Sequence, residues 1–530
     1  MQRRIQKIKN TIAKLNSIFL IAIAILIPSL VQAAVPSQFI AKQYTEALGR
    51  APDPGGWQGY TNYFNVNGCS QSTLGNIASV FFGSAEYMNK GYSAQEQVLT
   101  LYRAILSREP DPSGFNGDVS LLENGGTAAQ VALGMTASTE FTGLISSICT
   151  GKAYRQDWDL TWPMDIDNVG IWTNVDLQNC VTNNLVCNVP AGKIVEMFAT
   201  VTIPAGHTLQ TIGAPGRTMY ARQARIVRWS AFSGHLLLAS PGATVQDIWV
   251  NGSGNYFGPT GNGPVYANIE FETAPNTIGT IQNVRSDFPY MRTNFETQTP
   301  TQLPLGTVNI ISNLTVGYAS YHTTAEAAAA NAPISYQTYA PWADGISHHA
   351  GQGLIQGNDI VDPTDAGIVI FGFLTPATGQ APQSSSASEN NIVHAGSGAY
   401  GSAGLDTTGC GAGRCPFAGS GITNNTILAG QQQRIDILLF NGTSPWNWGG
   451  ASCATYCGTG GQITNNTTIQ GDPLQTITVL QGIVQDDMVS GSSVNNTLNV
   501  ARVAYGECYN SPPYTPVNYV CIAQYYAPYF

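Results

Sequence analysis

Short apolar segments rich in β-branched residues follow one another from Asp165 to the end of the chain, separated by stretches rich in Gly, Asn and Pro. This pattern predicts β-strands joined by turns, with a helical signal only at residues 325–330. A phrase with an Asn or Asp between apolar positions recurs at intervals of 36, 30, 45, 33, 34, 41 and 30 residues. Its recurring positions are Asp247, Asn283, Asn313, Asn358, Asn391, Asn425, Asn466 and Asn496. Because several phrases are followed by a second apolar segment, each repeat predicts two or three short strands.

The long, irregular period predicts a right-handed parallel β-helix, in which each repeat forms one rung and Asn amides stack from rung to rung. A β-sandwich is the alternative, but hairpin turns at its usual spacing of about 8–12 residues are scarce. The phrase Asn-Asn-x-Ile, as at Asn424–Ile427, resembles the rung signature of the pectin lyase-like superfamily of pectate lyases, polygalacturonases and phage tailspikes. That resemblance implies a fold and leaves the chemistry open. Residues 201–209 and 241–252 look like the first rungs.

The N-terminal part of the chain contains a duplicated helical unit. Residues 44–57 recur 58 positions later as residues 102–115, and Ser84-Ala-Glu-Tyr87 is echoed by Ser138-Thr-Glu-Phe141. In each copy we expect a helix to end at an Arg, a Pro-Asp-Pro turn to block its continuation, and a second helix to begin. Asp53 and Asp111 are the expected caps of these second helices.

Both copies carry a Tyr-x-x-x-Leu-x-Arg-x-Pro-Asp-x-x-Gly-aromatic turn. This turn resembles that of the bacterial domain of unknown function DUF4214, which recurs in exported and cell-surface proteins. The resemblance covers about 110 residues and implies attachment or assembly rather than catalysis. The pairs Arg50/Asp53 and Arg108/Asp111 are interpreted as structural ion pairs in a buried turn, with ligand binding as the alternative.

The first 33 residues have the features of a secretory signal peptide. Five basic residues and no acidic ones lie between positions 3 and 14, an apolar run covers residues 18–27, and Val31-Gln32-Ala33 offers a cleavage site. A retained anchor is the alternative, but the run is shorter than the ~20 residues needed to span a bilayer. Cleavage would change the net charge from -10 to about -15, and no later apolar stretch is long enough to span. We therefore expect a protein secreted by a bacterium, extracellular or at the cell surface.

The predicted domains are a signal peptide at 1–33, a duplicated helical domain at 38–148, a linker and β-helix cap at 149–190, and a parallel β-helix at 191–530. The predicted fold class is thus multidomain, with a small all-α module preceding a large all-β solenoid. The oligomeric state is left open.

The ten cysteines support an oxidising destination because their number is even and most fall into close sequential pairs. The predicted disulfides are Cys180/Cys187, Cys410/Cys415, Cys453/Cys457 and Cys508/Cys521, with Cys69/Cys149 remaining within the N-terminal region. Zinc is the alternative for such pairs, but no His lies beside those at 410–415 and 453–457.

Only 10% of the residues are charged, and acidic residues outnumber basic ones by 32 to 22. A chain without a basic excess is a poor partner for nucleic acid. Abundant uncharged polar residues favour a glycan, either free polysaccharide or cell-surface glycan, as the partner.

A β-helix that degrades glycans needs paired carboxylates, or a base with cationic groups for a lyase reaction. The candidate catalytic residues are Asp344, Asp365 and Asp436. Asp344 and Asp365 are 21 residues apart, close to one short rung, so their side chains are expected to stack. The alternative is a structural role, because Asp before Gly at a strand end is ordinary turn chemistry.

Further candidates are ligand-binding residues. Trp446 and Trp448 share a face if their segment is extended and are predicted to stack on sugars, although loop Trp residues also pack onto a solenoid. Arg434 shares a strand face with Asp436, with which it forms either a ligand-binding group or a simple ion pair.

No cofactor is predicted. Calcium at Asp359, Asp362 and Asp365 is a weak alternative, because their spacing matches no defined calcium loop. His348 and His349 would point to opposite faces of a strand, so a shared metal is not expected.

Two functions remain open from the sequence. The first is a non-enzymatic surface protein whose β-helix binds polysaccharide or another surface partner. The second is a polysaccharide hydrolase or lyase.

Overall fold

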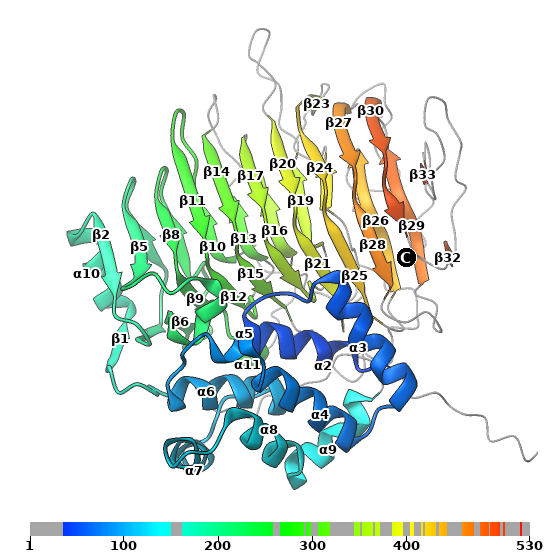
Figure 1. The fold of residues 1–530 in the computed structure, drawn as a ribbon. Helices are drawn as coiled ribbons and strands as arrows, with labels where there is room; N and C mark the ends of the chain where they lie inside the picture. Colours follow the sequence, from blue (N-terminus) through cyan, green and yellow to red (C-terminus); the bar gives the residue numbers. More distant parts are fainter. Residues whose placement is uncertain are drawn as a thin grey trace, which may run out of the picture.

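The computed structural model contains a helical module packed along one side of a three-sheet solenoid (Figure 1). It describes residues 35–149, 162–257, 266–290, 293–297, 306–317, 344–349, 352–363, 366–371, 384–395, 403–406, 415–416, 419–430, 434–442, 458–470, 478–486, 488–498, 502–503 and 520–521. The expected signal peptide lies outside these residues.

The helical module consists of two copies of one unit. Its helices are α2 (Ser37–Lys42), η1 (Gln43–Leu48), α3 (Pro54–Asn67), α4 (Gln71–Phe82), α5 (Ala85–Met88), α6 (Ala94–Leu101), η2 (Tyr102–Leu106), α7 (Pro112–Glu123), α8 (Ala128–Thr136) and α9 (Thr139–Ile148). The short elements η1 and η2 are π-helical and occupy equivalent places in the two copies. The duplicated sequence therefore folds as a duplicated structure.

The expected turn between the helices is confirmed. Asp53 caps α3 by accepting from the Gly56 amide, and Asp111 caps α7 by accepting from the amides of Ser113 and Gly114. A Cβ atom at Gly56 would lie 1.9 Å from the Tyr44 hydroxyl, and one at Gly114 would lie 2.0 Å from that of Tyr102. Glycine is required at these positions because the tyrosine fills the space of a side chain.

The two repeated phrases in each copy are joined by an ion pair. Arg50 donates to both carboxylate oxygens of Glu86, at 2.7 and 3.0 Å. Arg108 makes the same pair with Glu140, at 2.6 and 2.9 Å. Each arginine also approaches its turn aspartate more loosely, at 3.3–3.4 Å. The arginines thus make ion pairs within the module, as the structural interpretation expected, but their close partners are glutamates. The turn is also not buried, since the Asp53 and Asp111 side chains are 56% and 38% exposed.

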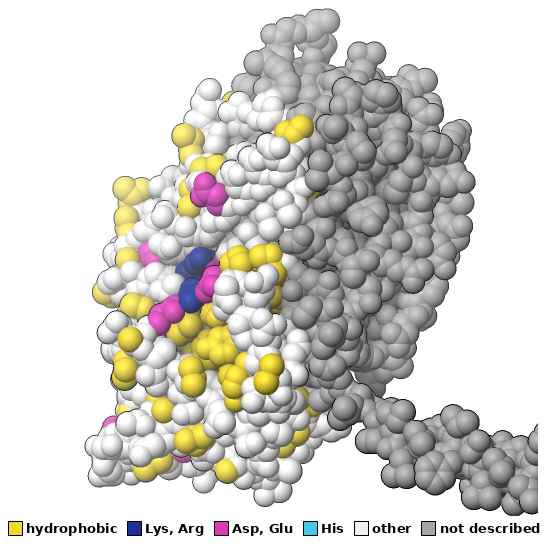
Figure 2. All heavy atoms as spheres, turned by 45° about the vertical axis from the view of Figure 1, so that its right-hand side comes forward, with side chains coloured by type: hydrophobic (Ala, Val, Ile, Leu, Met, Phe, Trp, Pro, Cys, Tyr) yellow, Lys and Arg dark blue, Asp and Glu magenta, His cyan; other side chains and the backbone are white. Residues whose placement is uncertain are grey.

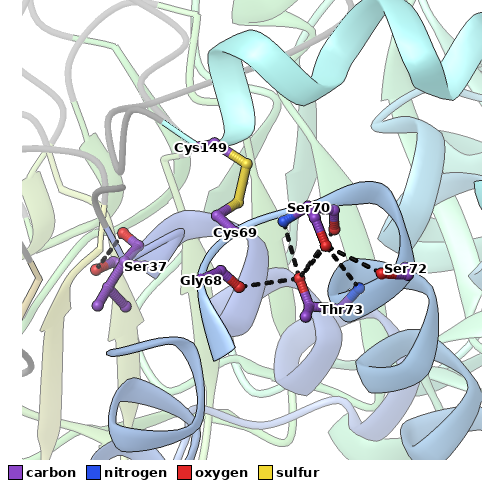
Figure 3. The surroundings of a disulfide bond; sticks show 8 residues. Ser37, Gly68, Cys69, Ser70, Ser72, Thr73 and Cys149 are labelled. Atoms are coloured by element: carbon purple, nitrogen blue, oxygen red, sulfur yellow. Dashed lines mark hydrogen bonds between the residues drawn. A yellow bond between two sulfur atoms is a disulfide. The ribbon is translucent and has the colours of Figure 1, made fainter. Parts of the chain in front are cut away.

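Two of the predicted disulfides lie in the described part of the chain. Cys69–Cys149 joins the turn before α4 to the end of α9, next to the Ser70–Thr73 capping box of α4 (Figure 3). Cys180–Cys187 joins α10 (Asn174–Asn183) to β2. The pairings predicted for Cys410, Cys415, Cys453, Cys457, Cys508 and Cys521 fall on residues, or side chains, outside the description.

The solenoid is built from three sheets in which every described pair of neighbouring strands is parallel. Sheet A contains β1 (Ile171–Thr173), β3 (Ile194–Met197), β6 (Ala224–Arg228), β9 (Ile248–Asn251), β12 (Arg285–Asp287), β15 (Leu314–Val316), β18 (Asp359–Val361), β21 (Asn391–His394), β25 (Thr426–Ala429), β28 (Thr467–Gln470) and β31 (Thr497–Leu498). Sheet B contains β2 (Val186–Val189), β5 (Thr208–Thr211), β8 (Thr244–Gln246), β11 (Ile278–Gln282), β14 (Thr307–Ile311), β17 (Gly353–Gln356), β20 (Ser385–Ser388), β24 (Gly421–Thr423), β27 (Gly458–Thr464), β23 (Cys415–Pro416) and β30 (Met488–Val494). Sheet C contains β4 (Val201–Ile203), β7 (Leu237–Ala239), β10 (Ala267–Phe271), β13 (Thr293–Thr297), β16 (Asp344–His348), β19 (Ile368–Phe371), β22 (Ala403–Asp406), β26 (Arg434–Gly442), β29 (Thr478–Asp486), β32 (Arg502–Val503) and β33 (Val520–Cys521).

Each rung runs from sheet B through a tight turn to sheet A and then to sheet C. Apolar side chains from the three sheets fill the interior, as expected for a parallel β-helix. The first rung begins at Ile171, within the segment expected to form a linker and cap. Leu177 and Val181 of α10 belong to the interior cluster, so this helix closes the end of the solenoid.

A ladder of buried Asn side chains runs along the turn between sheets B and A. Its members are Asn313, Asn358, Asn390, Asn425, Asn466 and Asn496, all at most 4% exposed. Asn425 is typical, because its backbone and side-chain amides both donate to Asn466 Oδ1 and its side chain also donates to the Ala387 carbonyl. In the repeat between Asn358 and Asn425, the ladder residue is Asn390 rather than the expected Asn391, which begins β21.

The ladder covers only the later rungs. Val284 occupies the equivalent place one rung before Asn313, and its amide donates to Asn313 Oδ1 at 2.9 Å. Asp247 and Asn283 instead lie one position earlier in the turn and have positive φ angles of 53° and 55°. The recurring Asn/Asp therefore serves two turn positions, both of which suit these residue types.

The helical module covers the outer face of sheet A. One apolar cluster joins its helices to outward residues of that sheet, among them Trp249, Leu314, Val361, Val393 and Leu428. Every residue of α2 and η1 is buried, because these two elements lie between the rest of the module and the solenoid.

Candidate functional site

Asp344 begins β16 in sheet C, and its side chain is 7% exposed. Its carboxylate accepts from the Ser347 hydroxyl at 2.6 Å and from the Ala366 amide at 3.0 Å. The pairing of Ile346 with Ile368 sets a register of 22 residues between β16 and β19, so Ala366 lies level with Asp344. Asp344 and Asp365 were expected to stack at a spacing of 21 residues, but the observed spacing between paired positions is 22. Asp365 itself lies outside the described residues.

The other predicted site residues remain predictions. Arg434 and Asp436 lie in β26 of sheet C, where the structure describes the backbone but not these side chains. Trp446 and Trp448 lie outside the described residues.

Two of the three aspartates considered for calcium, Asp359 and Asp362, contact the helical module, and Asp365 lies outside the described residues. Asp359 accepts from the Ala51 amide at 2.9 Å and pairs with Arg217 at 3.0 Å. Asp362 accepts from the Gln38 side chain at 2.9 Å. Within the described ranges there is no group of three or more His, Cys, Asp or Glu side chains placed to bind a metal ion.

The outer faces of the three sheets differ in what they present. On sheet A, six charged residues form an interdomain cluster with three arginines and three acids, and all but half-buried Glu109 are buried. Its members are Glu46, Arg103 and Glu109 from the module and Arg225, Arg285 and Asp287 from the solenoid.

The interdomain cluster is closely bonded. Arg103 contacts Glu46, Glu109 and Asp287 at 2.6–2.9 Å. Burial of the Glu109 carboxyl opposes ionisation, but Arg225 and Arg103 outweigh it and lower its pKa to about 2. Sheet A is therefore occupied by the protein itself and offers no open binding face where the module covers it.

The outer face of sheet C carries a pair of glutamates that the sequence reasoning missed. Glu270 of β10 and Glu296 of β13 lie directly beside each other in register. His235 pairs with Glu270, and His349 Nε2 lies 3.5 Å from Glu296. The two glutamate side chains are only 8% and 13% exposed. Each is the outward residue between two inward-pointing ones, which is the only sequence signal that marks them.

His349 is uncharged near neutral pH. Burial, with a smaller contribution from neighbouring His348, lowers its pKa to about 3. Its ring stacks on Phe371, with centroids 3.9 Å apart and planes 7° apart. An uncharged imidazole can donate a hydrogen bond through one ring nitrogen and accept one through the other.

The outer face of sheet B carries two rows of uncharged residues. Row one contains Val186, Thr208, Thr244, Thr280, Asn309, Leu354, Ser386, Gly421 and Gln462. Row two contains Asn188, Gln210, Gln246, Gln282, Ile311, Gln356, Ser388, Thr423 and Thr464. Except for buried Gly421, all are half-buried or exposed, and no charged residue occurs among them.

Figure 2 shows how few charged side chains the described surface carries on one face of the molecule. Uncharged polar and backbone atoms dominate there, and the basic side chains lie next to acidic ones. The low charge of the sequence is thus also a property of this surface.

The fold defines a protein in which a helical domain is fixed to a parallel β-helix. Residues 78–145, within the helical module, match the family described as "Domain of unknown function (DUF4214)". No curated protein sequence matches the chain significantly.

Among solved structures, the chain is similar to the Dettilon tailspike protein (gp208). The two share 10% sequence identity, with 62% of this chain and 64% of the tailspike chain covered and a TM-score of 0.28. The chain thus spans less than two thirds of the tailspike chain. The fold assignment rests on the three parallel sheets themselves.

The two observed disulfides fit an oxidising compartment. No helix in the described ranges combines the length and the apolar character that a bilayer crossing needs.

Proposed function

We propose that this chain is an exported bacterial protein, extracellular or on the cell surface, whose β-helix binds neutral polysaccharide through the outer face of sheet B. The observation that carries the proposal is the pair of uncharged rows on that face. Hydroxyl and amide groups donate and accept hydrogen bonds, which matches the hydroxyl-rich surface of a neutral sugar polymer.

The absence of charged residues from the two rows narrows the class of ligand. Acidic polysaccharides and nucleic acids are held mainly by Arg and Lys, and neither residue type occurs at the 18 row positions. A neutral polymer brings no ionic group that would have to be desolvated on such a face. The carboxylate of Glu389, just beyond β20, already accepts a hydrogen bond from Gln356 of row two at 3.0 Å.

The helical module fits a role in attachment or assembly. It is fixed to sheet A and does not cover the rows of sheet B (Figure 1). A ligand on sheet B and a partner on the outer surface of the module can therefore be engaged at the same time.

The binding proposal is tested with the purified mature protein. Retention on neutral glucan, mannan and chitin is compared with retention on polygalacturonate. We expect retention on at least one neutral polymer and its loss in Gln282→Arg, which places a charge in the middle of row two. Gln58→Arg is the matched control, because Gln58 is an exposed Gln of α3. Failure to bind any neutral polymer, or equal binding by Gln282→Arg, would refute the proposal.

A second candidate function, polysaccharide hydrolysis, is favoured by the Glu270/Glu296 pair. Strands in a sheet are about 4.8 Å apart, and retaining glycosidases place two carboxyl groups about 5–5.5 Å apart. His235 lies beside Glu270, and His349 lies beside Glu296. Asp344, also in sheet C, remains a candidate contributor.

The hydrolase candidate predicts release of reducing ends, whereas a lyase would produce unsaturated products that absorb in the ultraviolet. Turnover abolished by Glu270→Gln and by Glu296→Gln, but kept by Glu272→Gln just beyond β10, would support the pair as catalytic. Activity unchanged in both variants would exclude it.

A further inference from the structure

We infer that the polysaccharide bound by sheet B is an ordered, insoluble one, presented as a flat surface of many chains rather than as a single dissolved chain. This inference rests on the proposed function and specifies the physical state of its ligand. It is drawn from the shape, the internal bonding and the composition of the two rows.

The two rows form a long, regular array. Nine strands from β2 to β27 contribute to it, and the figure shows them side by side along the solenoid (Figure 1). At a strand spacing of about 4.8 Å, the array is roughly 40 Å long. Within each strand the two row positions are two residues apart, which separates the rows by about 6.6 Å. A ligand that uses the whole array must therefore be extended and wide enough to contact both rows.

Side chains at one end of the array are held by one another. Gln210 donates to Asn188 at 2.7 Å, and Gln246 donates to Gln210 at 2.6 Å, so three successive rungs are linked. An amide side chain offers two donor hydrogens and two acceptor lone pairs, so these bonds leave capacity for a ligand. Because the rotamers are already restricted, little side-chain freedom remains to be lost on binding.

The composition of the rows disfavours a single dissolved chain. Such ligands are usually stacked on aromatic rings or enclosed in a cleft, and no aromatic residue occurs at the 18 row positions. A flexible chain would also lose its own conformational freedom on a face that returns only weak polar contacts.

A solid polysaccharide avoids both difficulties. Its chains are already ordered, and its surface can contact many rungs at once, so that weak contacts add. The apolar row members Val186, Ile311 and Leu354 add small hydrophobic contacts of the kind that the carbon-bound hydrogens of sugar rings can make.

The experiment compares solid and dissolved forms of the same polymer. The full mature protein is mixed with crystalline cellulose or with chitin, and depletion from the supernatant is measured with and without the corresponding soluble hexasaccharide in millimolar excess. We expect saturable binding to at least one solid and less than a twofold weakening by the hexasaccharide.

Two double variants test whether the rows are responsible. Thr244→Ala with Thr280→Ala removes hydroxyls from row one, and Gln246→Ala with Gln282→Ala removes amides from row two. We expect each to weaken solid binding by about 5- to 10-fold, corresponding to one or two net hydrogen bonds. Gln58→Ala should bind as the unaltered protein does, and circular dichroism should show that all variants are folded.

The outcomes separate this inference from the function on which it rests. If the soluble hexasaccharide prevents binding to the solid, the protein binds neutral polysaccharide but recognises single chains, and the inference is wrong. If neither form of any neutral polymer binds, the proposed function fails as well. Solid binding that both double variants retain in full also overturns the inference.

Discussion

Replacing Arg285 with Met would test whether the interdomain cluster holds the module and the solenoid together as one unit. The Arg285 side chain is fully buried in β12. It donates to Glu46 at 2.6 Å, to Asp287 at 2.8 Å and to the Thr45 carbonyl at 3.0 Å, and it stacks over the Tyr220 ring. Methionine keeps most of the side-chain volume but removes the charge and all three bonds.

The expected loss follows from what remains around the two acids. Removing one partner of a buried ion pair costs about 3–5 kcal/mol. Glu46 would retain Arg103 and the Tyr220 hydroxyl, and Asp287 would retain Arg103 and the Trp249 indole. Because each acid keeps two donors, we expect a loss at the lower end of that range, about 3 kcal/mol of unfolding free energy.

Arg50→Met is the matched control. Arg50 also makes a bidentate pair, with Glu86, but the two side chains are 27% and 47% exposed and both belong to the module. Solvent screening reduces the value of such a pair, and we expect a loss of about 0.5–1 kcal/mol.

The measurement is equilibrium urea unfolding followed by near-ultraviolet circular dichroism and tryptophan fluorescence, since Trp249 lies within the interdomain contact. We also expect the module and the solenoid to unfold together in the unaltered protein. A loss below 1 kcal/mol in Arg285→Met, or equal losses in the two variants, would show that the cluster contributes little to holding the domains.

Three further predictions concern stability. Asn425→Ala should lower the unfolding free energy by about 3 kcal/mol, because it leaves buried donors of the Asn ladder unsatisfied. Asn391→Ala loses one part-buried hydrogen bond to a carboxylate and should lower it by about 1 kcal/mol in the same urea titration. The pKa of Glu109 falls from 4.5 to about 2 in the folded protein, so its contribution to stability is complete above pH 4.5 and is lost as the pH falls towards 2. Thermal melts should show this decline in melting temperature, and Glu109→Gln should show a smaller decline. Reducing or removing the Cys69–Cys149 bond, which spans 80 residues, should cost roughly 4 kcal/mol, and an unchanged melting temperature would contradict the loop-entropy account.

Local features of the fold could be read from the sequence because they depend on neighbouring residues. The Pro-Asp-Pro turn and its caps follow from the chemistry of Asp53 and Asp111. Strands and turns of the solenoid follow from alternating apolar residues and from residues that accept positive φ angles, such as Asn424 and Asn465. The Cys180–Cys187 bond spans seven residues and needed only local proximity.

The docking of the module could not be read in this way. The two copies differ where they contact the solenoid: Glu46 corresponds to Ala104, and Arg103 corresponds to Thr45, at the 58-residue offset. Both charged residues join the interdomain cluster. Departures from an internal repeat were therefore one sequence sign of this interface, but nothing in them named the partner.

A duplicated helical unit followed by a rung-built β-helix could be predicted from the sequence, because both patterns are set by local periodicity and turn chemistry. Which side chains meet between rungs depends on the three-dimensional fold. Paired positions in sheet C are 26 residues apart from β10 to β13, 51 from β13 to β16 and 22 from β16 to β19. Since loop length varies freely between rungs, the register that joins Glu270 to Glu296 and aligns the rows of sheet B is fixed by strand pairing across the whole solenoid.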